Sequence, residues 1–444
     1  MAAGQPQSRA GSLRGVYSPD DVEAYVPGLI EQFSLLEDPR DPRGVRHQLV
    51  DLVVVSVLAV ICGANTYSMM HTFGINRLEW LRRFLTLKHG IPSQDTFERI
   101  FEVIQPEAWQ RLFLDWTGQL PLPALPDGER EIVAIDGKTS RGSASPGLKA
   151  LHTVNVFSVQ HNVVLSAAGV PEKTNEITVL PELIRVIAPV GAIITTDAMG
   201  CQKEVARAVR DVPGADYLLA VKKNHPKLEA EIDWLFRHHD QDGWRETDSS
   251  LAMTHNTGHG RTETRECRLM RDLTVLEQAR EWKDLHAVVR VRATRTIGDK
   301  TSVEDRFYLT SLQGEAGEAL HASRLHWGVE NGLHWLLDVV FRDDASKIKL
   351  ANARQNWVSL RHFALTLLRR PGAGKGSVET KRFKAALEPD YLLSLLTLRQ
   401  PCPRMVHGAP GADDMLKFRR AESAPRGTKT TSAPLAQMDR ATAF

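Results

Sequence analysis

Two aspartates stand where buried, strand-like segments of the sequence end. Asp136 follows the apolar run Ile132–Ile135, and Asp197 closes the run Gly191–Thr196. One such carboxylate is usually a satisfied loop residue, but two on neighbouring strands repel each other unless cations lie between them. Oxygen ligands of this kind suit Mg²⁺ or Mn²⁺, which keep several waters and bind phosphate oxygens. The pair predicts a site for divalent metal ions.

The surrounding periodicity predicts that the two aspartates are neighbours. Strands are expected at 131–136, 152–160, 162–170, 191–197 and 216–223. Helices are expected between the last three of these strands, at 178–186 and 201–209. Three antiparallel strands followed by right-handed crossovers place the fourth strand beside the first. Asp136 and Asp197 should therefore lie side by side at one edge of the sheet.

A third acid is needed, because two carboxylates do not hold two metal ions well. The best candidate is Glu330, within a periodic apolar segment over 324–338 that predicts a helix. Gly328 and Gly332 interrupt this segment, and each costs roughly 1 kcal/mol relative to alanine. Such glycines are tolerated where another group must approach the helix backbone closely. Asp338, Asp343 and Asp344 are the competing acids.

Two other motifs fail on spacing. Gly137-Lys138-Thr139 could end a P-loop, but the first glycine of that motif would fall at Ile132, inside the strand. The His-Glu-x-x-His pattern of zinc proteases is absent around Glu330, although His326, Glu330 and His334 recur at every fourth position. Neither nucleotide binding through a P-loop nor a zinc-protease site is indicated.

Three segments closely resemble the acid-bearing blocks of bacterial insertion-sequence DDE transposases, and most of all the group that includes the H-repeat-associated proteins. They are Ala134–Lys138, Thr195–Gly200 and His326–Phe341, of which the third is the most specific. The resemblance spans residues 25–370. It implies an RNase H-like catalytic domain with a mainly β insertion before the third acid. It also implies that Asp136, Asp197 and Glu330 are the catalytic, metal-binding triad.

The activity implied by the resemblance is DNA transposition with Mg²⁺, for which Mn²⁺ can substitute. The protein would bind the terminal inverted repeats of its own element as a homodimer, nick the phosphodiester and join the 3′-hydroxyl end to target DNA. Many relatives carry Tyr, Arg and Lys seven and four residues before and seven after the Glu, where this sequence has Ser323, His326 and Leu337. A hairpin route of excision is therefore not implied. A nuclease of the same fold that does not join ends, and an inactive DNA-binding remnant, remain alternatives.

Local clusters of positive charge would have to hold the DNA. The 56 Lys and Arg against 54 Asp and Glu leave a net charge of only +2, which is no global nucleic-acid signature. Predicted DNA contacts are Lys138, Arg141, Lys222, Lys223, His326, Trp327, His334, Arg342, Lys347, Lys349 and Arg354. Solvated helix faces are the alternative for each cation. Trp327 could stack on an unpaired base, whereas Trp335 is expected to pack in the core.

The predicted fold class is α/β: a mixed RNase H-like sheet with flanking helices. Four zones are expected: a disordered N-terminus over 1–20, a helical domain over 21–120, a catalytic domain over 121–375 and a largely flexible extension over 376–444. A β-rich insertion is expected at about 225–313, with strands at 262–270, 286–294 and 303–310. Amphipathic patterns after Pro92 and Pro106 favour either an ordinary helical subdomain or a helix-turn-helix that binds DNA ends.

Cysteine content and hydropathy predict a reducing, cytosolic setting, and the resemblance to bacterial transposases implies the bacterial cytoplasm, with association to the nucleoid through bound DNA. The four cysteines lie far apart, without CxxC or histidine spacing, so neither a disulfide framework nor a zinc site is indicated. The longest apolar run, Leu49–Cys62, contains Asp51 and is too short to span a membrane. No membrane partner is expected.

Overall fold

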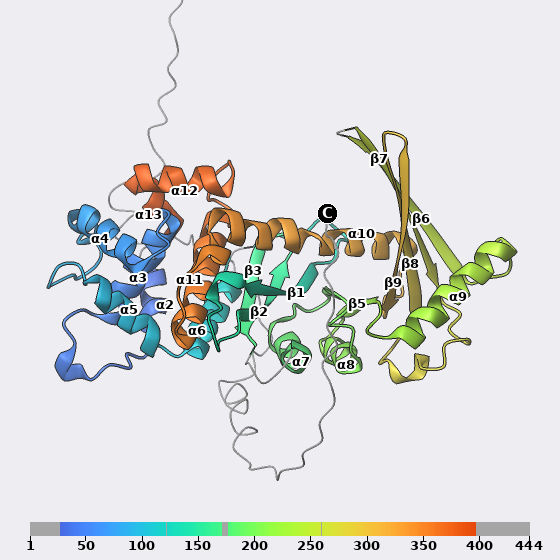
Figure 1. The fold of residues 1–444 in the computed structure, drawn as a ribbon, viewed down its shortest axis with the longest axis horizontal. Helices are drawn as coiled ribbons and strands as arrows, with labels where there is room; N and C mark the ends of the chain where they lie inside the picture. Colours follow the sequence, from blue (N-terminus) through green and yellow to red (C-terminus); the bar gives the residue numbers. More distant parts are fainter. Residues whose placement is uncertain (1–26, 121, 171–175, 259, 397–444) are drawn as a thin grey trace, which may run out of the picture. The chain divides into compact units, whose positions relative to one another are not determined.

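The strands form one mixed sheet in the computed structural model, which describes residues 27–120, 122–170, 176–258 and 260–396. The strand order across this nine-stranded sheet is β3-β2-β1-β4-β5-β9-β8-β7-β6 (Figure 1). The strands are β1 (Ile132–Ser140), β2 (Leu151–Ser158), β3 (Val163–Gly169), β4 (Ile193–Thr196), β5 (Asp216–Val221), β6 (Ser249–Gly258), β7 (Arg261–Met270), β8 (Ala287–Ile297) and β9 (Lys300–Thr310).

The first five strands have the predicted topology. β1 and β2 are antiparallel, as are β2 and β3, and β4 lies parallel beside β1 with Val133 opposite Ile194. β5 continues the parallel set beside β4. Their apolar residues are buried on both faces, as expected for strands covered by helices on each side. The mixed sheet with flanking helices confirms the predicted α/β class.

The β-rich insertion extends this same sheet. β9 pairs antiparallel with β5, with Leu219 opposite Leu309, and β8, β7 and β6 follow in antiparallel order. Figure 1 shows these long strands running beyond the helices. The edge strand β6 was not predicted; Leu251 and Met253, both exposed, are its only large apolar residues, which gives too short an apolar pattern. The three predicted insertion strands correspond to β7, β8 and β9.

Helices cover both faces of the central strands. α10 contacts β1, β4 and β5 and reaches β6, β7 and β8, while α7 and α8 lie on the opposite side of the sheet (Figure 1). The helices are α2 (Pro27–Ser34), α3 (Leu49–Ile61), α4 (Tyr67–Leu81), α5 (Gln94–Val103), α6 (Pro106–Gly118), α7 (Glu176–Ile187), α8 (Lys203–Asp211), α9 (Pro226–Asp242), α10 (Ala316–His326), α11 (Ala351–Arg369), α12 (Val378–Leu387) and α13 (Pro389–Leu396). Short 3-10 turns are η1 (Pro42–Gly44), η2 (Arg141–Ser143), η3 (Ala279–Glu281) and η6 (Asp343–Ala345).

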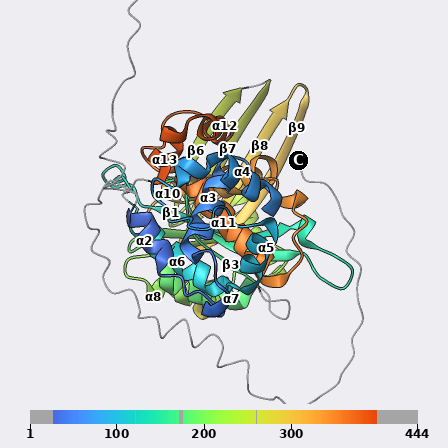
Figure 2. The same cartoon turned by 90° about the vertical axis from the view of Figure 1, so that its left-hand side faces the viewer.

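The N-terminal helices share their core with α11. This helix contacts α3, α5 and α6, and also β3 (Figure 2). The ring of Phe363 on α11 lies 4.7 Å from Phe113 and 5.0 Å from Trp116, both on α6. The predicted helix pair after Pro92 and Pro106 is therefore present as α5 and α6, with its apolar side buried. Its role as a reader of DNA ends stays a prediction.

The ends of the chain are described in part. α12 and α13 are ordered helices with buried leucines, so the extension expected to be flexible from residue 376 is helical as far as Leu396. The remainder of that extension, and the N-terminus expected to be disordered, lie outside the described residues. Within the described ranges, no helix combines the length and apolar character needed to cross a membrane.

Candidate active site

The parallel pairing of β1 and β4 brings the first two acids to one place. Ile135 lies opposite Thr196, so Asp136 and Asp197 are the next residues on adjacent strands. Asp136 is not the end of its strand, as the sequence suggested, since β1 continues to Ser140 by pairing with β2. β4 stops at Thr196, which leaves Asp136 accessible from the side of Asp197.

The predicted helix over 324–338 departs from α-helical geometry at the third acid. α10 ends at His326, and two π-helical turns follow: η4 (Glu330–His334) and η5 (Leu336–Val340). Glu330 begins the first of them. π-Helical turns are rare and occur frequently at functional sites, because they change the direction in which side chains leave the helix.

The two glycines of this segment allow it to lie close to β2 and the turn that follows. A Cβ atom at Gly328 would lie 2.7 Å from the Cγ1 of Val159, and one at Gly332 would lie 3.3 Å from the ring of Phe157. Arg369 of α11 also donates a hydrogen bond to the carbonyl of Gly332, within the π-helical turn η4. The close approach expected from the glycines is confirmed, and it places Glu330 over the strand that carries Asp136.

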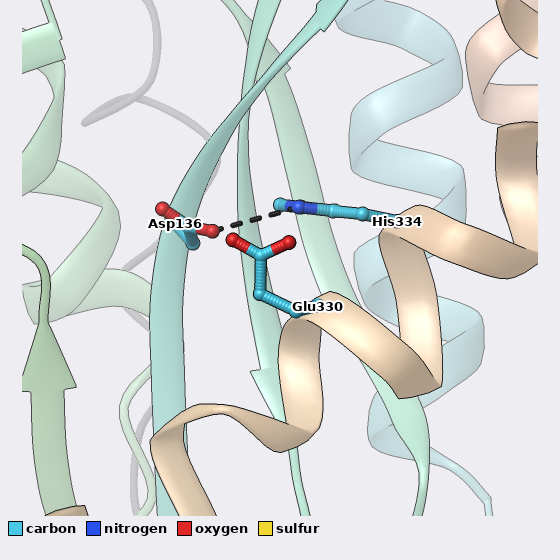
Figure 3. A group of neighbouring side chains, drawn as sticks. All are labelled: Asp136, Glu330 and His334. Carbon is cyan, nitrogen blue, oxygen red and sulfur yellow. Dashed lines mark ion pairs between the residues drawn. The ribbon is translucent and has the colours of Figure 1, made fainter. Parts of the chain in front are cut away.

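Asp136, Glu330 and His334 form one group of potential metal ligands (Figure 3). Each contributes a ligand atom, and these atoms all lie within 4.8 Å of one another. The Nδ1 atom of His334 is 3.5 Å from Oδ2 of Asp136. Carboxylate oxygens with one imidazole nitrogen fit Mg²⁺ or Mn²⁺, with Mn²⁺ the more tolerant of nitrogen.

Asp197 faces the same site from the other side. It lines an open cavity together with Asp136 and Glu330, and the wall includes His326 and Lys222. The side chain of Asp197 also accepts a hydrogen bond from the backbone N–H of Gly200, at 3.1 Å. The three acids of the predicted triad are thus brought together, and their carboxylates give a hard, oxygen-rich donor set suited to divalent ions.

Both histidines near the acids are neutral at pH 7. Burial lowers the pKa of His326 to about 4, and the charges of Arg306 and Lys222 act in the same direction. Burial likewise lowers the pKa of His334 to about 4. The Nδ1 atom of His326 lies 2.9 Å from the hydroxyl of Thr195. A contact of either imidazole with a DNA phosphate would therefore be made in the neutral form at pH 7, and these two predicted contacts stay predictions.

A second acidic group lies further along the chain and is neutralised by buried cations. Asp338, Asp343 and Asp344 have carboxylate oxygens within 4.8 Å of one another. The Nζ atom of Lys138 is 2.5 Å from Asp338 and 3.4 Å from Asp343, and Arg361 is also paired with Asp343. Burial opposes ionisation of Asp343, but the charges of Arg361 and Lys138 and the hydrogen bond from Ser140 hold its pKa below the usual value.

Two of the cations predicted to contact DNA are buried. Lys138 is 6% exposed and occupied by the second acidic group, and Arg354 is 7% exposed and donates to the carbonyl of Lys149. Both side chains thus make contacts inside the protein. His334 is also buried, against Asp136. Whether any of these three buried residues contacts DNA stays a prediction.

The remaining predicted contacts lie at or near the surface. Arg141, Lys222, Lys223, Trp327, Arg342 and Lys347 are exposed, and Lys349 is half-buried with its ammonium on the carbonyls of Gly142 and Ala144. Lys222 and Trp327 line the cavity of the three acids. Trp335 is 52% exposed, so the expectation that it packs in the core was wrong.

Arg306 and Asn155 are site residues that the sequence did not reveal. The guanidinium of Arg306 lies 4.4 Å from the centroid of the Trp327 ring and lines the cavity with Lys222. Asn155 on β2 is fully buried opposite Asp136, and its amide has no partner among the described residues. No motif marks either residue. Only the sheet register, which joins β9 to β5 and β2 to β1, places them here.

Two family models match the chain. The model described as "Transposase DDE domain" matches residues 127–367, and the model described as "DDE_Tnp_1-associated" matches residues 30–117. The first spans all three acids and the whole sheet. The second spans α3 to α5 and most of α2 and α6.

Several proteins of Escherichia coli are similar over most of this chain. "Putative transposase YncI" of strain O157:H7 is 36% identical over 84% of this chain and 95% of its own length. "H repeat-associated putative transposase YhhI" of strain K12 is 33% identical over 83% of this chain and 97% of its own length. Among solved structures, the piggyBac transposase synaptic complex with hairpin DNA aligns over 93% of this chain and 84% of that chain, with a TM-score of 0.37 and 11% identity.

Proposed function

Since this chain belongs to the DDE transposase family, we propose that it binds the ends of an insertion sequence, nicks them and transfers the 3′-hydroxyl end to target DNA. The observation that carries the proposal is the convergence of Asp136, Asp197 and Glu330 on one open cavity. They come from two adjacent parallel strands and from a helical segment packed over them.

Each acid has a distinct position in the proposed site. Asp136 is central, because it shares the cavity with Asp197 and Glu330 and also faces His334. When bound, divalent ions would make the attacking water or 3′-hydroxyl more acidic and would stabilise negative charge on the leaving oxygen. The carboxylates hold these ions and fix the direction from which the nucleophile reaches the phosphorus.

Cations at and beside the cavity suit a phosphate backbone. Lys222 and Arg306 line the cavity itself, and Lys223 lines a neighbouring one that shares Lys222 and Arg306 with it. Cations at such positions neutralise phosphates and set the path of the strand. Trp327 stands exposed next to them, with Arg306 against its ring, and offers a surface on which a base could stack. A homodimer on paired DNA ends is part of the proposal.

The test is a cleavage and joining assay on a plasmid that carries the gene with its flanking DNA. We expect nicks at the boundaries of the element and joined products in the presence of Mg²⁺ or Mn²⁺, and none in EDTA. Asp136→Asn and Asp197→Asn should each abolish both products, because removing a ligand deletes Lewis-acid stabilisation worth several kcal/mol. DNA binding should persist, because affinity depends mainly on the cations.

Asp344→Asn is the matched control, since this acid belongs to the second group and lies near Lys138 and Arg141. It should keep both products. Nicking at the wild-type rate by Asp136→Asn or Asp197→Asn would refute the assignment of the site. If the protein nicks DNA but yields no joined products, even when it is given pre-cleaved ends, it is a nuclease and not a transposase.

A further inference from the structure

His334 is a buried imidazole that faces the acids. It is 9% exposed, and its Nε2 atom has no hydrogen-bond partner among the described residues. Its Nδ1 atom lies 3.5 Å from Asp136, at the long limit of a hydrogen bond. Buried polar nitrogens are normally satisfied, so an imidazole held in this way requires an explanation.

The turn that carries Glu330 also positions His334. Both residues belong to η4, which they begin and end, and both side chains point toward Asp136 in Figure 3. The close packing of Gly328 and Gly332 on Val159 and Phe157 holds this turn against the sheet. A contact of the buried His334 with DNA would need the site to open, whereas contact with an ion held by Asp136 and Glu330 needs no exposure to solvent.

We infer that His334 is a ligand of one of the two metal ions, so that one position is held by Asp136, Glu330 and an imidazole nitrogen. This inference rests on the proposed function, because it assigns a ligand at the same site. Asp197 is not a member of this ligand group and lies on the open, cavity side. The two ion positions are therefore chemically different: one has carboxylate ligands only, and the other has a nitrogen ligand as well.

A nitrogen ligand changes the metal preference of its position. First-row transition-metal ions bind imidazole nitrogen increasingly well from Mn²⁺ to Cu²⁺, and even Mn²⁺ accepts nitrogen more readily than Mg²⁺, which prefers oxygen. The position with His334 should favour Mn²⁺ over Mg²⁺, and the position on the Asp197 side should discriminate less. The all-carboxylate site expected from the sequence would show no such difference between the two ions.

Pulsed electron paramagnetic resonance of the full-length protein loaded with Mn²⁺ tests the ligand directly. Electron spin echo modulation should show coupling of the manganese electron spin to a directly bound ¹⁴N nucleus. In protein labelled with ¹⁵N-histidine, the ¹⁴N coupling should be replaced by a ¹⁵N coupling. This labelling experiment identifies a histidine ligand without any amino-acid substitution. In His334→Gln the coupling should disappear, and Mn²⁺ affinity by calorimetry should fall about tenfold or more. His326→Gln, which removes the other imidazole near the three acids, should keep the coupling.

The outcomes separate the ligand from the function. The inference is wrong if the wild-type protein binds Mn²⁺ but shows no coupling to a histidine nitrogen. It is also wrong if His326→Gln loses the coupling while His334→Gln keeps it. Either result leaves the assignment of the three acids unaffected. Protein that binds no Mn²⁺, and whose products are unaffected by Asp136→Asn, overturns the proposed function itself. An unfolded His334→Gln variant would not affect the labelling result.

Discussion

Glu330 and Asp338 lie eight residues apart on one helical segment but have different surroundings. Glu330 is exposed to the cavity, and its carboxylate lies near Asp136. Asp338 is 2.5 Å from the ammonium of Lys138 and belongs to the second acidic group. The two acids therefore have separable roles, although both were candidates for the third ligand.

Substitution of each acid by its amide should distinguish these roles. Glu330→Gln should eliminate nicking and strand transfer without lowering the unfolding temperature, since an exposed carboxylate contributes little to stability. Asp338→Asn should keep measurable nicking but lower the unfolding temperature, because it leaves buried Lys138 with one fewer counter-ion. Strand transfer retained by Glu330→Gln and lost by Asp338→Asn would move the third ligand to Asp338.

Lys138 offers a second contrast at the scale of single residues. If Lys138 contacted DNA, its substitution would weaken DNA binding. Because Lys138 is the buried partner of Asp338 and Asp343, its substitution should instead lower the stability of the folded protein. We expect Lys138→Met to lower the free energy of unfolding by about 3 kcal/mol, as for removal of one member of a buried ion pair. Arg141→Met, at an exposed position 3.7 Å from Asp344, should cost less than about 1 kcal/mol. Urea denaturation measures both. If Lys138→Met had unchanged stability but bound DNA more weakly, Lys138 would be a DNA contact.

The sequence identified residues by type but not by their surroundings. Asp136 and Asp197 could be predicted as neighbours, because strand periodicity and the handedness of crossovers follow from local pattern. The burial of Lys138 depends on Asp338 and Asp343, two hundred residues away, and no local pattern encodes that contact. The proximity of His334 to Asp136 depends in the same way on how η4 packs on the sheet. The exposure of Trp335 likewise depends on packing, which local pattern does not show.

At the scale of elements, the approach of η4 to the sheet depends on its small residues. Glycine to alanine normally stabilises a helix by up to about 1 kcal/mol. At Gly328 the new methyl group would lie 2.7 Å from Val159, so we expect Gly328→Ala to lower both the unfolding temperature and the nicking rate. Gly317→Ala is the matched control on α10, where the space around the Cβ is open, and it should be neutral or stabilising. Circular dichroism and the nicking assay measure the two effects.

A compensating substitution makes this prediction specific. Val159→Ala should restore much of the activity of Gly328→Ala, because it removes the atom that the new methyl group would meet. Failure of this rescue, or a Gly328→Ala protein more stable than the wild type, would show that close packing is not what positions Glu330. The helix was predictable from its apolar period, but its two π-helical turns were not, since they follow from contacts with β2 and α11.

At the scale of the whole molecule, His362 makes stability depend on pH. This residue of α11 is completely buried, and burial lowers its pKa from 6.5 to about 3, with Asp343 acting in the opposite direction. The unfolded chain takes up a proton below pH 6.5, whereas the folded protein does not until about pH 3. His362 should therefore reduce the free energy of unfolding by about 1.4 kcal/mol per pH unit as the pH falls through this window.

The variant His362→Phe should remove this contribution, since its ring can occupy the same apolar position beside Phe113. Urea denaturation at pH 7 and pH 5 should show a smaller loss of stability in the variant than in the wild type. Other histidines with lowered pKa titrate in both proteins, so the difference between the two slopes is the diagnostic quantity. Equal slopes would mean that the imidazole is already protonated in the folded protein.

The position of α11 has a consequence for synthesis on the ribosome. α11 completes the core formed by α3, α5 and α6, yet the whole sheet is translated between them. At elongation rates of about 5–20 residues per second, the apolar sides of these early helices remain uncovered for on the order of ten seconds or longer before residues 351–369 emerge. During that interval the nascent chain presents binding surface for chaperones. Translation of an mRNA truncated before the codons of α11 yields a fragment whose N-terminal helices lack their packing partner. Such a fragment would be a substrate for proteases.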